Sequence, residues 1–129
     1  MPKQSIIALF GEAEKGDYHR PYYFSALEQL ADTLGEPPPE TTGLFYAIQA
    51  LLYQHPLFYI RVREEGFSLG DYNRGLYTLE KEELMPKLDA LCLPGVGDRT
   101  LMRSLLEVCV IYHQVLITNE ADLYDYLTA

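Results

Sequence analysis

The chain has 129 residues, of which 48% are hydrophobic and 22% charged, with 19 acidic residues against 10 Lys and Arg. This length and apolar fraction exclude a disordered chain and predict one domain, residues 1–129, with a buried core. The formal net charge of −9 argues against nucleic acid or an anionic membrane as a partner. The apolar runs are too short for a bilayer span or a signal peptide, so we expect a cytoplasmic protein.

The beginning of the chain predicts a strand and a helix. Residues 5–10 form a continuous apolar run that ends at Gly11, as expected of a strand buried on both faces. Pro21 can open a helix because its fixed φ suits the first turn. Apolar residues then recur at helical spacing as far as Leu34, and Gly35 can end that helix.

A second helix and strand follow a rigid connector. The three prolines at 37–39 fit neither a helix interior nor a central strand. Thr41 or Thr42 can cap the next helix, and Pro56 stops it. Residues 57–62 are rich in aromatic and β-branched side chains, which predicts a second strand.

The second half of the chain continues the alternation. Residues 68–80 predict a helix, 89–93 a strand, 100–113 a strong helix and 115–118 a strand, and Asn119 can cap a last helix. This alternation predicts a three-layer α/β fold, a Rossmann-like open parallel sheet of four to five strands with helices on both faces.

In such a sheet ligands bind where the strands end at their carboxyl side. The loop of residues 94–100 has two glycines before a helix start, which favours a phosphate cradle or, alternatively, a plain β-α turn. The loop of residues 11–17 is not a nucleotide phosphate loop, because Asp17 stands where that motif needs Lys. Glu12 and Asp17 could hold a divalent cation there, or the loop could simply be solvated.

The two cysteines, Cys92 and Cys109, both lie in apolar runs. Neither belongs to a Cys-x-x-Cys pair, and no histidine stands at zinc-ligand spacing from them. We therefore expect buried free thiols in a reducing compartment, with no metal and no cofactor. No serine or cysteine has the sequence surroundings of a catalytic nucleophile.

The order of several short segments carries a resemblance. An apolar strand ends at Gly11, Gly43-Leu44-Phe45 opens a helix, residues 89–95 lead into a glycine-bearing loop, and residues 105–108 lie in the helix after it. In this order the segments resemble the lysine decarboxylase-like, or Lonely guy, family of phosphoribohydrolases and the related Rossmann-like nucleotide binders that include molybdenum-cofactor carriers.

The resemblance implies a nucleotide-type pocket and a homodimer. It also implies no catalytic residue, because the family's catalytic Glu falls on Met102, Arg103 or Ser104, none of which is a carboxylate. The ligand-binding residues expected from the loops and the resemblance together are Gly11, Glu12, Thr42, Gly43, Gly95, Gly97, Asp98 and Thr100.

Three functions follow as hypotheses. The first is a catalytically degenerate, nucleotide-binding-like domain that acts as a binding or interaction protein, with a nucleotide or another phosphate-bearing small molecule as ligand. The second is a small nucleoside or ribosyl hydrolase that uses Glu12 or Asp98 as its acid. The third is a structural interaction protein with no small ligand.

Overall fold

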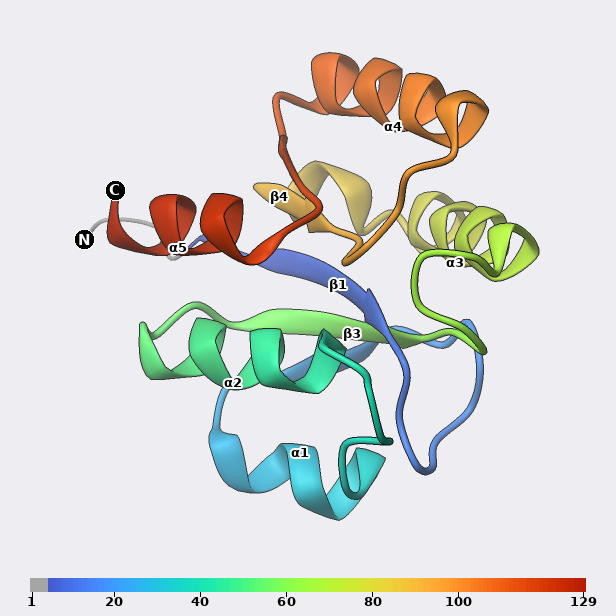
Figure 1. Cartoon of the computed structure of the whole chain (residues 1–129). Helices are drawn as coiled ribbons and strands as arrows, with labels where there is room; N and C mark the ends of the chain where they lie inside the picture. The colour runs from blue at the N-terminus through green and yellow to red at the C-terminus, as the bar shows by residue number, and fades with distance from the viewer. Residues whose placement is uncertain (1–4) are drawn as a thin grey trace.

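The computed structural model describes residues 5–129; residues 1–4 of the predicted domain lie outside this range. One sheet of five strands, in the spatial order β2-β3-β1-β4-β5, runs through the centre of the molecule (Figure 1). All neighbouring strands are parallel except β2, which is antiparallel to β3. The strands are β1 (Ile7–Gly11), β2 (Tyr22–Phe24), β3 (Leu57–Arg61), β4 (Ala90–Cys92) and β5 (Val115–Ile117).

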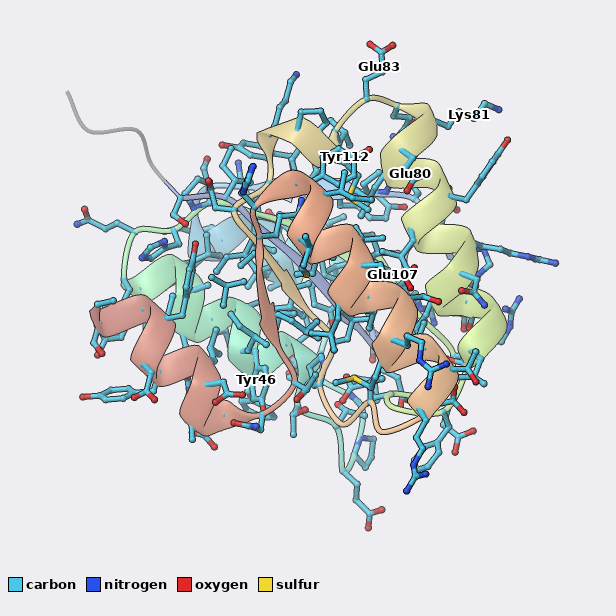
Figure 2. All side chains as sticks on the ribbon, turned by 90° about the horizontal axis from the view of Figure 1, so that it is seen from above. Tyr46, Glu80, Lys81, Glu83, Glu107 and Tyr112 are labelled. Atoms are coloured by element: carbon cyan, nitrogen blue, oxygen red, sulfur yellow. The ribbon has the colours of Figure 1, made fainter. Side chains whose placement is uncertain are left out.

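Helices cover both faces of this sheet, which confirms the predicted three-layer α/β, Rossmann-like fold. Figure 2 shows α2 and α5 on one side of the strands and α3 and α4 on the other. The first layer consists of α1 (Leu27–Leu34), α2 (Gly43–Leu52) and α5 (Glu120–Thr128). The second consists of α3 (Leu69–Lys81), the short 3-10 helix η1 (Met85–Lys87) and α4 (Arg99–Tyr112).

The central strand β1 explains why two layers can form. All five of its residues are buried. Ile7 and Leu9 belong to the core under α1, α2 and α5, whereas Ala8 and Phe10 belong to the core under α3 and α4. Because successive side chains of a strand point to opposite faces, a run of apolar residues supplies both cores at once.

Side-chain caps start the last two helices. The Asn119 carboxamide oxygen accepts the Asp122 N–H at 2.8 Å, as the sequence predicts. The Asp98 carboxylate accepts the Leu101 N–H at 2.9 Å and caps α4. Such caps satisfy backbone donors that a helix leaves unpaired at its first turn.

The structure corrects the prediction that Pro21 opens a helix. The residues after it form β2, which pairs with β3 so that Tyr22 lies opposite Tyr59. The helix α1 begins only at Leu27, because the Gln29 side chain accepts the N–H groups of residues 25 and 26 at 2.8 and 3.2 Å. The outer edge of β3 gains backbone hydrogen bonds from β2, and this long-range pairing outweighs the local preference of Pro21.

Two further predictions concern the cysteine thiols and membrane-spanning helices. Cys92 and Cys109 are both buried and free, and burial raises the pKa of both thiols, so both stay protonated at neutral pH. Among residues 5–129, no helix combines the length and apolar character that crossing a membrane requires.

Candidate functional site

The carboxyl ends of the parallel strands meet in one cleft. Its walls come from the loops after β1, β3 and β4 and from the segment before α2, and it has a volume of about 360 Å³. We call it the rim cleft. It is lined by Glu12, Thr42 and Gly95 from the predicted ligand residues, and by Glu64 and Glu65 from the loop after β3. The turns after the first and third predicted strands therefore do meet on one edge of the sheet, as the parallel topology requires.

The Glu65 carboxylate occupies the start of α2. Its Oε2 atom accepts the N–H groups of Glu12 at 2.8 Å and Gly43 at 2.9 Å. Its Oε1 atom accepts the Thr42 N–H at 2.8 Å and the Thr42 hydroxyl at 3.3 Å. The Thr42 and Gly43 N–H groups lie at the N-terminus of α2, where an anion is favoured by the helix dipole. The chain's own carboxylate thus lies where a phosphate oxygen would be expected.

A return contact holds the same two loops together. The Glu65 N–H donates to the Glu12 carboxylate at 3.0 Å, while the Glu12 N–H donates to Glu65. The loop after β1 and the loop after β3 are therefore joined by two reciprocal hydrogen bonds. The Glu12 carboxylate is engaged in holding a backbone amide.

Gly11 and Gly43 are needed because other groups come very close to them. A Cβ atom at Gly43 would lie 2.5 Å from the Tyr59 hydroxyl oxygen and 2.7 Å from a Glu65 carboxylate oxygen, and a Cβ atom at Gly11 would overlap the same Tyr59 hydroxyl. That hydroxyl donates to the Glu12 carbonyl at 2.8 Å. Tyr59 is fully buried, and burial raises its pKa well above the ordinary value. The glycines therefore make room for Tyr59 and Glu65.

The loop after β4 divides between the cleft and α4. Gly95 has a φ of 78° and donates its N–H to the Thr118 carbonyl at 3.0 Å, so its conformation favours glycine. Gly97, Asp98 and Thr100 are not among the described residues that line the rim cleft. Asp98 caps α4, so a carboxylate of the chain occupies this helix start as well.

The structure does not bring the predicted cation ligands into one group. The Glu12 carboxylate binds the Glu65 N–H, whereas Asp17 pairs with Arg20 at 3.5 Å and donates its N–H to the Tyr22 hydroxyl at 2.7 Å. Within residues 5–129, no group of three or more His, Cys, Asp or Glu side chains could hold a metal ion.

An ionic cluster around the buried Asp71 was not predicted. Asp71 is 4% exposed, and one of its carboxylate oxygens accepts from His19 Nε2 at 2.5 Å and from Arg63 Nη1 at 2.6 Å. The other accepts the Arg63 N–H at 2.8 Å. Burial favours the neutral acid, but the hydrogen bonds and charges of His19 and Arg63 outweigh it and lower the pKa of Asp71. The only local signal is that Asp71 lies on the same helix face as the buried Gly75 and Leu79.

This cluster fastens the loop after β1 onto α3. The guanidinium groups of Arg61 and Arg63 also lie over the Tyr18 ring, 4.2 and 4.6 Å from its centre. His19 contacts a carboxylate and not a nucleophile, so the cluster has the composition of a structural ion pair.

Comparisons with protein-family models, with curated proteins and with solved structures found no match for this chain.

Proposed function

We propose that this chain is a non-catalytic interaction domain of Rossmann-like fold whose ligand-binding edge is closed by its own Glu65. The observation that carries the proposal is the seat of the Glu65 carboxylate on the N–H groups of Glu12, Thr42 and Gly43. A phosphate could use those donors only by displacing a carboxylate that is already hydrogen-bonded to all of them.

The charge of the rim cleft supports the same conclusion. Its lining holds four acidic residues, Glu12, Glu40, Glu64 and Glu65, and no Lys or Arg among the described residues. A nucleotide phosphate entering this cleft would be repelled by these carboxylates, and no side-chain cation would offset the repulsion.

The two acids that a hydrolase would need already accept hydrogen bonds from backbone N–H groups. Glu12 accepts the Glu65 N–H, and Asp98 accepts the Leu101 N–H. A general acid must reach the leaving group with a proton to give. Both carboxylates instead serve as hydrogen-bond acceptors for the backbone, which favours an interaction protein over a nucleoside hydrolase.

One observation favours nucleotide binding as a second candidate. The donors that converge on Glu65 form a ready anion site, so a ligand that pushed Glu65 aside would find it preformed.

Thermal unfolding with nucleoside monophosphates separates the two candidates. We expect no stabilisation of the wild type by any of the four monophosphates at millimolar concentration. A nucleotide present at a hundred times its Kd would add about 2.7 kcal/mol of stability. Such a shift in the wild type, unchanged in the control Glu107→Ala, an exposed residue of α4 that does not line the rim cleft, would overturn the proposal in favour of nucleotide binding.

The homodimer and the cytoplasmic location that the sequence suggests stay predictions. Sedimentation equilibrium of the whole chain tests the first, and cell fractionation tests the second.

A further inference from the structure

The helix α2 exposes an unusual amount of apolar surface. Its ten residues contain no charged side chain, and Phe45 and Leu52 are 53% and 63% exposed. Ile48 lies between them at helical spacing, so the three form one outward stripe. A helix that is apolar all round is normally buried on all sides. The inner face of α2 packs against the sheet, so the exposed apolar side chains lie on its outer face.

An apolar groove runs beside this stripe. It lies between α1 and α2, which are neighbours in Figure 1, and has a volume of about 350 Å³. We call it the α1/α2 groove. Its apolar walls include Leu27, Leu30, Ala31, Leu44 and Ile48. The helices span 8 and 10 residues, about 12 and 15 Å, which suits two to three turns of another helix.

The charged side chains of α1, α2 and α5 are all acidic. Residues 21–60 and 113–129, which include α1, α2 and α5, contain no Lys or Arg. The same two segments hold seven acids, which are Glu28, Asp32, Glu36, Glu40, Glu120, Asp122 and Asp125. The segment 69–112 on the other side of the sheet contains five Lys and Arg. That segment also holds seven acids, so the two layers differ in their basic residues and not in their number of acids.

We propose that the α1/α2 groove binds a basic amphipathic helix of a protein partner. Its apolar side would enter the groove against Leu27 and Ile48, and its Lys and Arg side chains would face the exposed acids Glu28, Asp32 and Glu36. This is the helix-in-groove mode of recognition, in which apolar anchors supply affinity and charge supplies orientation.

Charge decides against a second copy of this chain as the occupant. Two copies that met through this face in a symmetric dimer would bring acids against acids, because α1 and α2 have no Lys or Arg to pair with them. The inference deepens the proposed function by naming the partner's chemistry, and it rests on that function.

The test uses the whole chain and a synthetic peptide. The peptide has about 18 residues, with Leu at helical spacing and Lys elsewhere, a length that supports a helix. The groove variant Glu28→Gln/Asp32→Asn/Glu36→Gln removes two exposed charges of α1 and that of Glu36, which lines the groove. The control Glu80→Gln/Glu82→Gln/Glu83→Gln removes three at the far end of α3, where Figure 2 shows Glu80 and Glu83 on the other side of the sheet from α2.

We expect saturable binding of the peptide by the wild type, measured by fluorescence anisotropy. The groove variant should bind about tenfold more weakly, which is ~1.4 kcal/mol, and the control should match the wild type. Leu27→Ser should weaken binding as well, without loss of the folded circular dichroism spectrum. All these side chains are exposed, so the variants should fold.

Three outcomes would overturn the inference: no saturable binding, equal weakening in both triple variants, or self-association that Leu27→Ser abolishes. The last would assign the groove to a second copy. A nucleotide that stabilised the wild type would instead overturn the proposed function at the rim cleft. The peptide and nucleotide measurements report on different surfaces, so the two failures are distinguishable.

Discussion

Replacing Glu65 by Ala should destabilise the protein more than any other change to an acidic residue of the rim cleft. The substitution leaves the N–H groups of Glu12, Thr42 and Gly43 without their acceptor. Each lost hydrogen bond costs about 1 kcal/mol where water can take part of its place. We therefore expect a loss of about 3 kcal/mol in the free energy of unfolding. For a chain of 129 residues, this lowers Tm by about 11 °C.

Two variants give the scale for this measurement. Glu65→Gln keeps one acceptor oxygen but loses the charge, so its free energy of unfolding should fall by about half as much as that of Glu65→Ala. Glu64→Ala, next in sequence, removes an exposed carboxylate and should stay within about 0.5 kcal/mol of the wild type.

Urea unfolding followed by circular dichroism provides the free energies, and amide hydrogen exchange locates the effect. In Glu65→Ala the amides of Thr42 and Gly43 should exchange faster, while those of β1 keep their relative protection. If Glu65→Ala were as stable as Glu64→Ala, the Glu65 carboxylate would not hold the start of α2, and the rim cleft would not be closed by it.

Three further predictions concern the rest of the structure. Gly43→Ala should lower the free energy of unfolding by about 3 kcal/mol, because its Cβ atom would lie 2.5 Å from the Tyr59 hydroxyl. Gly70→Ala, in open space on α3, should instead raise it by about 0.5 to 1 kcal/mol. Urea unfolding measures both changes. The lowered pKa of Asp71 stabilises the fold above the ordinary carboxyl pKa of 3.8, and this stability is lost as the pH falls through the folded pKa. The fall in stability from pH 7 to pH 3 should therefore be smaller in Asp71→Asn than in the wild type, and equal falls would contradict the ion cluster. Asp98→Ala should lower the free energy of unfolding by about 1 kcal/mol, because α4 loses its cap, and Asp98→Asn should lower it much less. Equal losses of the two variants in thermal unfolding would argue against capping by Asp98.

The strand β1 and the cap of the last helix could be predicted because their signals are local, whereas Thr42, predicted as a cap of α2, makes no side-chain capping hydrogen bond. The apolar run that ends at Gly11 belongs to a strand that is buried on both faces, and Asn119 carries its own capping oxygen. The strand β2 was missed because it has only three residues and exists through its pairing with β3. Its partner Tyr59 is far from Tyr22 along the chain, and Pro21 locally suits a helix start.

The candidate site was predictable only in part. Gly11 and Gly43 were predicted as ligand-binding residues, and the structure shows that the Tyr59 hydroxyl of the chain itself lies close to both. Glu65 was missed, because its partners Glu12 and Thr42 are 53 and 23 residues away and nothing in its own loop distinguishes it from Glu64. Side-chain contacts between distant loops depend on the assembled fold, which a local pattern does not encode.

A rim cleft closed by the chain itself requires that the Glu65 carboxylate, and no external anion, lies at the start of α2. A crystal structure of the wild type grown with a high concentration of inorganic phosphate identifies the anion at this position. We predict the Glu65 carboxylate on the amides of Thr42 and Gly43, as in the structure described above. Electron density for phosphate on those amides, with Glu65 turned away, would contradict the closure of the rim cleft by Glu65.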